Sequence, residues 1–257
     1  NNEKIGIFGD YDVDGASSTS LLGNFFSTIN QTYEIYIPDR KKEGYGPSIS
    51  AFKKFIQNGV KLIFTVDCGT LSFNAIDYAK QNNIDVIVLD HHQSEINLPK
   101  AYSVVNPNRI DDKSNLNYLC AAGVAFMFLV SVNQGLRLDG WYKSKNKSEP
   151  NLLNYLDLVT LGTVCDVVPL VGLNRAIVKQ GLKILSSKKN LGIKTLLDIC
   201  DVNCNPNVYH VGYLLGPRIN AGGRVGKSSH GANLLLNKDP KDTYRIAMEL
   251  DEFNRER

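Results

Sequence analysis

The chain is organised around the stretch Gly9-Asp10-Tyr11-Asp12-Val13-Asp14-Gly15, which places three carboxylates at alternating positions. The apolar segment 5–8 before it is typical of a buried strand, and residues 16–29 after it show the spacing of a helix. The carboxylates are therefore predicted on a strand-to-helix turn. Like charges this close repel one another unless protons or a cation neutralise them, and hard divalent cations prefer carboxylate oxygens. A divalent metal ion is the natural partner of this stretch.

Two other interpretations apply to the same acidic stretch. The pattern D-x-D-x-D-G opens a calcium EF-hand loop, but the twelfth position counted from Asp10 is Leu21, where that loop needs a bidentate glutamate. The preceding element is also a predicted strand, whereas an EF-hand begins with a helix. A solvated acidic turn without a ligand stays open as an interpretation of this stretch taken alone.

Composition indicates a globular protein, because 43% of the 257 residues are hydrophobic. The formal net charge of +3, from 29 basic and 26 acidic residues, is too small to identify a nucleic-acid-binding protein by itself. Five cysteines without a C-x-x-C pair argue against a disulfide framework or zinc knuckle, so a reducing, cytoplasmic location is predicted. The longest uncharged apolar run, residues 119–132, is too short to span a bilayer, so no membrane association is expected.

Two further apolar runs end in possible metal ligands. Residues 62–66 are typical of a strand buried on both faces and lead to Asp67, and residues 85–89 lead to Asp90-His91-His92. Helical segments separate these strands, so we expect an α/β fold with a parallel sheet flanked by helices. Ligands of such sheets gather outside the carboxyl ends of the strands. Three such ends on one edge predict a metal site, with the neighbouring histidine side chains diverging from one another.

The rest of the chain is predicted to be more helical and carries two further motifs. The segment 162–169, GTVCDVVP, places the lone acid Asp166 among apolar residues, where it needs a metal or another partner, or caps a helix. The segment 216–226 combines Arg218 and Arg224 with several glycines. Such a segment suits close approach to a phosphate, and a purely structural turn is the alternative. Helical spacing from residue 242 predicts a long connecting helix at the end of the chain.

These motifs resemble, in order, those of the DHH phosphoesterase superfamily, and residues 216–224, GPRINAGGR, resemble the arginine motif of the RecJ-type single-stranded-DNA-specific exonucleases. The resemblance covers almost the whole chain. It implies 5′-to-3′ hydrolysis of single-stranded DNA to 5′-mononucleotides, in DNA repair and recombination, with two divalent ions, Mn²⁺ or Mg²⁺, as cofactors. The alternative enzyme is a DHH phosphodiesterase for short oligoribonucleotides or cyclic dinucleotides, or a pyrophosphatase. A replication scaffold would be expected to have damaged motifs, and these are intact.

The resemblance also implies roles for single residues. The implied metal ligands are Asp10, Asp12, Asp14, Asp67, His91 and Asp166. Asp67 would bridge the two ions, and Asp10 would join them directly or through water. His92 would face the scissile phosphate, Asp90 would orient the histidines, and Arg218 would hold a phosphate oxygen. The implied substrate-binding set is Arg218, Asn220, Gly222, Gly223 and Arg224. Some members of the superfamily carry a metal-binding histidine where this chain has Phe8, which leaves the ligands of the first ion open.

The same resemblance suggests three parts: residues 1–110 as the parallel α/β part, residues 111–238 as a helical remainder of the catalytic core, and residues 239–257 as a helix leading to a C-terminal domain absent from this sequence. Relatives of this type usually also carry an OB-fold that holds single-stranded DNA, so we expect an isolated catalytic core. Single-stranded DNA is the implied partner. A single-strand-binding protein and a helicase are candidate partners through regions that this sequence lacks.

Overall fold

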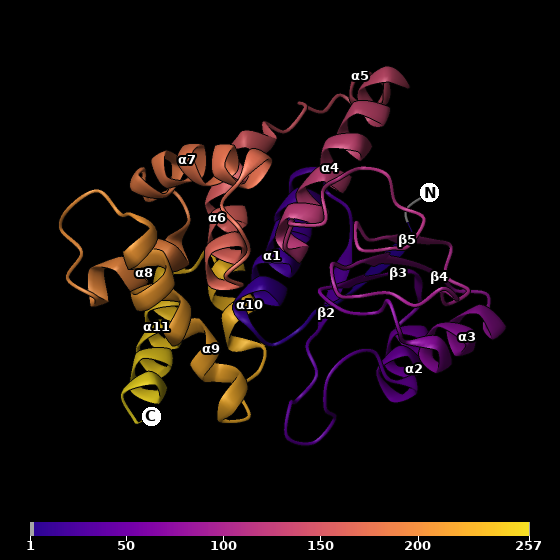
Figure 1. Ribbon diagram of the computed structural model, residues 1–257, viewed down its shortest axis with the longest axis horizontal. Coiled ribbons are helices and arrows are strands. Elements are labelled where there is room, and N and C mark those ends of the chain that lie inside the picture. The colour runs from indigo at the N-terminus through magenta and orange to yellow at the C-terminus, as the bar shows by residue number, and fades with distance from the viewer. Residues whose placement is uncertain (1–2, 257) are drawn as a thin grey trace.

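A five-stranded parallel sheet forms one side of the molecule and a set of packed helices forms the other (Figure 1). The computed structural model describes residues 3–256. The strands are β1 Lys4–Phe8, β2 Tyr33–Tyr36, β3 Val60–Val66, β4 Asp85–Leu89 and β5 Ser103–Val105. They lie in the order β2-β1-β3-β4-β5, and every pair is parallel. Strand β2 therefore lies on one side of β1, whereas β3, β4 and β5 lie on the other side. Open α/β sheets bind ligands at such a point, where the strand order switches between β1 and β3.

Helices cover both faces of the sheet, which is why the strand sequences are apolar on both sides. Helices α2 (Ile49–Gln57) and α3 (Phe73–Gln81) cover one face. Helices α1 (Val13–Thr28) and α4 (Ala121–Leu138) cover the other. Strand side chains alternate, so Phe64 belongs to the core beneath α1 and α4, and its neighbour Ile63 belongs to the core beneath α2 and α3.

The second half is helical and is built against α1. Its elements are α5 Trp141–Ser144, a 3₁₀ turn Leu152–Tyr155, α6 Leu156–Cys165, α7 Gly172–Ser186, α8 Leu191–Ile199, a π-helical segment His210–Leu215, α9 Gly216–Arg224, α10 His230–Leu236 and α11 Pro240–Arg255. Helices α6 and α10 pack directly on α1. As a result, α1 is shared between the sheet side and the helical side, and it begins at the acidic stretch.

The predicted α/β fold with a parallel sheet is confirmed, and three details differ. Helix α1 starts at Val13, so Asp14 lies in its first turn and Asp12 is its N-cap. The glycine-rich segment, for which a purely structural turn was the alternative to close approach to a phosphate, is helix α9. Helix α11 packs against α8 and α9 with Ile246 and Leu250 buried, so a connecting role is not evident from its packing. Residues 1, 2 and 257 of the predicted parts lie outside the described residues.

Helix α4 meets the length and mean hydropathy of a membrane span, with a mean hydropathy of 1.3 over its 18 residues. Its N-terminal half is nevertheless buried in the protein, and residues such as Ala125 and Leu129 belong to the larger core cluster. The apolar composition of α4 is thus explained by packing against α1 and α6.

Candidate metal centre

Acidic and histidine side chains follow three neighbouring strands at the same edge of the sheet. Asp10 and Asp12 follow β1, Asp67 comes directly after β3, and His91 follows β4 by two positions. The backbone of Gly15 donates a hydrogen bond of 2.9 Å to the Asp12 carboxylate, which fixes that side chain at the start of α1. Parallel strands end at one edge, so residues far apart in sequence meet there.

The six predicted metal ligands are brought together in one cluster. The side chains form three groups, and in each group one potential ligand atom of every residue lies within 4.8 Å of those of the other two. The groups are Asp10, Asp12 and Asp67; Asp14, His91 and Asp166; and Asp67, His91 and His92. Asp67 and His91 each belong to two groups, so the groups are continuous. Asp166 reaches the cluster from the helical side, where it lies at the C-terminal end of α6.

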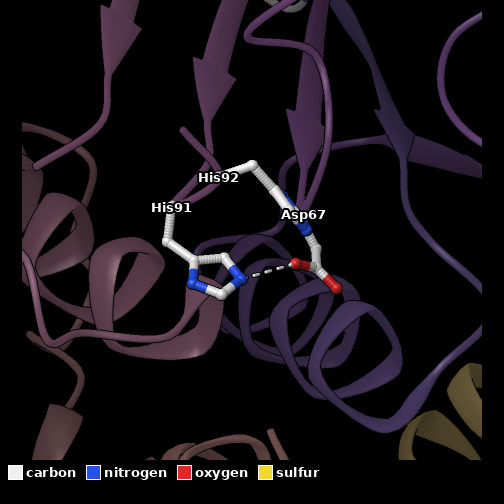
Figure 2. A group of neighbouring side chains, drawn as sticks. All are labelled: Asp67, His91 and His92. Atoms are coloured by element: carbon white, nitrogen blue, oxygen red, sulfur yellow. Dashed lines mark ion pairs between the residues drawn. The ribbon is translucent and has the colours of Figure 1, made fainter. Parts of the chain in front are cut away.

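His91 lies at the centre of these acids. Its Nε2 is 3.3 Å from Oδ1 of Asp67, and Figure 2 shows this imidazole turned toward the carboxylate. The same nitrogen is 3.7 Å from Asp166 and 3.8 Å from Asp14. Burial, and then the neighbouring charge of His92, lower the pKa of His91. A neutral imidazole with a nitrogen facing three carboxylates is suited to binding a metal ion.

The carboxylates of the cluster are hard to ionise together. Burial, followed by repulsion from Asp12, raises the pKa of Asp10 to about 7. Burial, followed by repulsion from Asp166, raises the pKa of Asp14 to about 8. Burial and then repulsion from Asp14 also place the pKa of Asp67 well above its usual range. All three shifts have the same origin, a buried set of like charges without enough positive charge on the protein to balance it.

Unsatisfied oxygens in the cluster match what a divalent cation requires. Oδ1 of Asp10 and Oδ1 of Asp67 are buried and accept no hydrogen bond from the described part of the chain. Unpaired buried anionic oxygens are costly, and buried charges are normally paired or bound to metal. Carboxylate oxygens mixed with an imidazole nitrogen are the donor set of a hard or borderline ion such as Mg²⁺ or Mn²⁺. The residues present therefore fit a divalent metal ion.

Asp14 is anchored through both of its carboxylate oxygens. Its two oxygens accept hydrogen bonds from the backbone N–H groups of Ala121, at 2.6 Å, and Ala122, at 2.9 Å. These N–H groups have no acceptor within the helix because they lie in the first turn of α4, where the helix dipole favours negative charge. Asp14 thus joins three elements, since it stands on α1, is held by α4 and faces Asp166 at the end of α6.

Asp90 orders the loop that carries the histidines. Its Oδ1 accepts hydrogen bonds from the backbone of His91 at 2.8 Å and from Nδ1 of His92 at 2.7 Å, and its Oδ2 accepts one from the backbone of Thr70 at 3.0 Å. Burial opposes ionisation of Asp90, but the hydrogen bonds from His92 and Thr70 outweigh it and hold its pKa below the usual range. The same hydrogen bond, which His92 donates to Asp90, raises the pKa of His92.

The two histidines lie closer together than expected. Their ring centroids are 4.6 Å apart, with 53° between the ring planes, so the side chains do not diverge as neighbours on a strand would. The reason is that β4 ends at Leu89, and the loop after it turns both rings toward the same side. They differ in exposure, because the side chain of His91 is 14% exposed and that of His92 is 48% exposed.

An open cavity of about 360 Å³ adjoins the acidic cluster. Its lining residues are Asp10, Tyr11, Asp12, Arg40, Tyr45, Asp67, His92, Asn220 and Arg224. Arg40 and Arg224 supply positive charge to this cavity. The guanidinium of Arg40 lies over the ring of Tyr11, with its central carbon 5.2 Å from the ring centroid. Acids are thus combined with arginines in a space large enough for a phosphate-bearing group.

Helix α9 brings Asn220 and Arg224 to the cavity. Oδ1 of Asn220 accepts a hydrogen bond of 3.0 Å from the backbone of Val13, which ties α9 to the start of α1. A side chain at Gly223 would lie 3.2 Å from the backbone oxygen of Tyr11, so a glycine there permits the close approach of the two segments. A side chain at Gly222 would similarly meet the backbone of Lys227 at 2.9 Å. The glycines thus serve helix packing.

Arg218 does not line the cavity. Its Nε donates to Asp251 of α11 at 2.8 Å, and its Nη1 donates to the backbone oxygen of Leu214 at 2.8 Å. The Asp251 side chain is buried, and it also accepts from Arg255. Among the residues predicted to bind substrate, the structure brings Asn220 and Arg224 to the acidic cluster and holds Arg218 between α9 and α11.

Three cavity residues were not assigned a role from the sequence. Tyr11 lies within the acidic motif, and Arg40 and Tyr45 lie in the basic, glycine-rich loop after β2. A basic, glycine-rich loop fits either a segment beside a substrate or a plain surface connection, and the structure places this loop at the cavity. No local sequence pattern distinguishes these two possibilities, because the contacts of the loop span many residues.

Comparison with known proteins agrees with this geometry. The sequence profile of the DHH family, N-terminal domain, matches residues 4–163, which includes the sheet, the acidic stretch and the histidine pair. The chain belongs to the DHH family. Asp166 and helix α9 lie beyond the residues that this DHH profile covers, so their assignment depends on the geometry described above.

Similar DHH proteins are named as single-stranded-DNA-specific exonucleases. The chain is 38% identical to RecJ of Dickeya dadantii over 100% of its own length and 45% of that protein, and 37% identical to RecJ of Escherichia coli over 99% and 44%. A crystal structure of exonuclease RecJ bound to manganese superposes with a TM-score of 0.85 at 30% identity, covering 99% of this chain and 62% of that one. The chain therefore spans less than half the length of these curated relatives.

A second solved relative, RecJ of Thermus thermophilus, was crystallised in complex with Mn²⁺. It has a TM-score of 0.81 and 28% identity over 99% of this chain and 35% of that one. The same relative in complex with Mg²⁺ gives a TM-score of 0.69. The ions named for these structures are those that suit the oxygen-rich cluster of this DHH chain.

Proposed function

We propose that this chain is a metal-dependent exonuclease core that hydrolyses single-stranded DNA in the 5′-to-3′ direction and releases 5′-mononucleotides. The observation that carries the proposal is the meeting of Asp67, His91 and the acidic stretch at one sheet edge, with buried carboxylate oxygens that accept no hydrogen bond within the described residues. The family membership and the exonuclease names of the relatives support it. The alternative, a phosphodiesterase for short oligoribonucleotides or cyclic dinucleotides, is not favoured by these relatives.

Two divalent ions, Mn²⁺ or Mg²⁺, would be held by two neighbouring groups of residues. Asp10, Asp12 and Asp67 would hold one ion, and Asp14, His91 and Asp166 would hold the other. Asp67 would bridge the two ions, because its Oδ1 lies 3.3 Å from Nε2 of His91. Ions bound in this way would supply a hydroxide at neutral pH and stabilise the attacking and leaving oxygens of the phosphodiester. The anchoring of Asp14 by the N-terminus of α4 would keep the second group in place.

The cavity residues would bind and orient the phosphate. His92 has Nδ1 committed to Asp90, which leaves Nε2 free to donate to a phosphate oxygen when the ring is protonated. Arg40 and Arg224 line the same cavity and are suited to phosphate oxygens because a guanidinium presents several donors in one plane. Asn220 would add an amide donor, since its oxygen is occupied by Val13. Arg218 would act indirectly, by fixing α9 on α11.

The wider assignments follow from the same proposal. We retain residues 1–110 and 111–238 as the two parts of the catalytic core and residues 239–257 as the segment leading to further domains. A role in DNA repair and recombination, a cytoplasmic location, and contacts with a single-strand-binding protein or a helicase would belong to the whole protein. The free thiols of all five cysteines are consistent with a reducing compartment.

The test is hydrolysis of oligonucleotides labelled at the 5′ or 3′ end in the presence of Mn²⁺. We expect labelled mononucleotide from the 5′ end of single-stranded DNA first, with poor cleavage of blunt duplexes. The Asp67→Ala variant should lose more than about 100-fold in rate, because even the outer partners of metal ligands are commonly worth 10–100-fold. Asp85→Ala is the matched control, since Asp85 is an exposed aspartate at the opposite end of β4.

The proposal also predicts weak binding that depends on salt. Phosphate contacts release counterions, so affinity should fall steeply as the salt concentration rises. Extending the substrate beyond a few nucleotides should add little affinity, because the cavity is small and the net charge is only +3. Preferential hydrolysis of RNA, or wild-type turnover in Asp67→Ala, would contradict the proposal.

A further inference from the structure

Tyr45 lies in a loop that is built to hold it over the site. The loop between β2 and α2 is closed at its base by Asp39 and Glu43, since the backbone N–H of Glu43 donates to the Asp39 oxygen at 2.8 Å and the Glu43 carboxylate accepts from the Asp39 N–H at 2.9 Å. Gly44 and Gly46 flank Tyr45 with φ of +80° and +84°, a region that favours glycine. The tyrosine therefore sits at the tip of a turn that fixes its direction.

The Tyr45 hydroxyl connects the ends of two strands. It donates to the backbone oxygen of Asp67 at 2.8 Å, and it lies 3.1 Å from Nδ1 of His92. Asp67 has φ of +61°, an uncommon conformation for a residue other than glycine, and the hydroxyl satisfies the carbonyl of that residue. Because Tyr45 is 53% exposed, burial alone does not hold its side chain in place, and the hydrogen-bond contacts of its hydroxyl contribute to its position.

The contacts define how the proton on His92 is shared. Nδ1 carries at most one hydrogen, and it lies 2.7 Å from the carboxylate of Asp90, so the Nδ1–H donates mainly to Asp90. The Tyr45 hydroxyl donates its hydrogen bond to the backbone oxygen of Asp67, so a lone pair of the hydroxyl oxygen faces the Nδ1–H of His92. The ring of Tyr45 also meets the imidazole edge to face, with centroids 5.6 Å apart and 68° between the planes. Asp90 thus orients Nδ1 of His92, and Tyr45 restricts rotation of the His92 imidazole.

We propose that Tyr45 is a positioning residue for His92, holding the imidazole so that Nε2 faces the phosphate in the cavity. This inference rests on the proposed function of the cavity and adds a residue to it. Tyr45 would not contact the reacting atoms itself. It would act through His92 and through the carbonyl of Asp67, and it would connect the basic loop to the ends of β3 and β4.

The kinetic test compares Tyr45→Phe, which keeps the ring, with Tyr45→Ala. Loss of one hydrogen bond of about 0.5–1.5 kcal/mol corresponds to a 2- to 10-fold lower kcat for Tyr45→Phe, with KM for a short single strand unchanged. Tyr45→Ala should lower kcat further, since a displaced group can cost about 100-fold. In a His92→Ala background, Tyr45→Phe should have no further effect. Tyr102→Phe is the control, because Tyr102 is an exposed tyrosine directly before β5.

A second measurement separates this inference from the proposed function. The chain has four histidines, so the imidazole nitrogen signals of His92 can be assigned by nuclear magnetic resonance without any substrate. Tyr45→Phe should shift or broaden the His92 Nδ1 signal and leave that of His210 unchanged. If the protein fails to cleave DNA but Tyr45→Phe still changes the His92 Nδ1 signal, only the proposed function is contradicted. An unchanged His92 signal, a full additive loss with His92→Ala, or a raised KM at constant kcat would overturn the role of Tyr45.

Discussion

His91 and His92 are neighbours in sequence, and their hydrogen-bond partners give them opposite properties. Burial lowers the pKa of His91, which faces Asp67, Asp14 and Asp166. A hydrogen bond to Asp90 raises the pKa of His92, whose side chain is about half exposed to the cavity. A neutral imidazole suits a metal ion and a protonated one suits a phosphate. In the proposed site the two residues would therefore divide two tasks that a single histidine could not perform at one pH.

This division predicts different losses when each histidine is removed. His91→Ala should weaken Mn²⁺ binding by at least about 10-fold and lower turnover as well, because it removes a proposed ligand. His92→Ala should bind Mn²⁺ almost normally but lose about 100-fold in kcat, the usual cost of removing one donor that stabilises the transition state. Titration calorimetry with Mn²⁺, together with kcat on a single-stranded oligonucleotide, measures both quantities.

His210→Ala provides the control for these substitutions, since the His210 ring bonds to the backbone of Asn207 and has no contact with the cluster among the described residues. Equal losses of Mn²⁺ affinity in His91→Ala and His92→Ala would reverse the assignment and make His92 a ligand.

At the scale of elements, local motifs could be predicted and packing contacts could not. The acidic stretch, Asp67 and the histidine pair follow apolar runs, so their place at strand ends is visible in the sequence. The arginine motif was predicted to approach a phosphate, with a structural turn as the alternative because glycines usually mark turns. It is helix α9, because Leu215 and Ile219 continue a buried face and tertiary packing overrides the local preference. The contact between Tyr45 and His92 spans 47 residues, and no local pattern encodes it.

Helix packing around Asp14 gives a prediction at this scale. A side chain at Gly162 of α6 would lie 2.5 Å from Oδ1 of Asp14 and 2.7 Å from Ala122 on α4. Gly162→Ala should therefore push these helices apart, lower the free energy of unfolding by about 1–3 kcal/mol, and weaken Mn²⁺ binding by displacing Asp14. Denaturant unfolding and Mn²⁺ titration measure these two effects.

Gly135→Ala is the matched control for this substitution. Gly135 lies within α4 with no described atom inside 4 Å of the added carbon, so alanine there should raise stability by up to about 1 kcal/mol and leave Mn²⁺ binding unchanged. The packing argument is wrong if Gly162→Ala unfolds and binds Mn²⁺ as the unsubstituted protein does.

At the scale of the whole molecule, the site lies between the sheet side and the helical side. The sheet side supplies Asp10, Asp67 and His91, and the helical side supplies Asp166 and Arg224. Like charges from both sides meet in this interface, so the carboxylates repel each other across it in the metal-free protein. The fold of each side could be predicted from its own sequence pattern, whereas this juxtaposition depends on how α1 joins them.

The last prediction follows from these buried charges. The pKa values of about 7 for Asp10 and about 8 for Asp14 exceed the ordinary 3.8, so between these values the folded protein holds protons that the unfolded chain releases. The metal-free protein should therefore lose stability as the pH rises from about 6.5 to 8.5. The lowered pKa of His91 acts in the opposite direction, but only below about 6.5. Thermal unfolding in a chelator should show Tm falling across this range, by about 2–4 °C for each kcal/mol lost. Saturating Mn²⁺ should reverse the fall, with a larger rise in Tm at pH 8.5 than at pH 6.5. Asp14→Asn should flatten the dependence in the chelator, because it removes one of the carboxylates whose pKa is raised in the folded protein. A metal-free Tm that rises or stays constant between pH 6.5 and 8.5 would show that these carboxylates are not held protonated by burial and mutual repulsion.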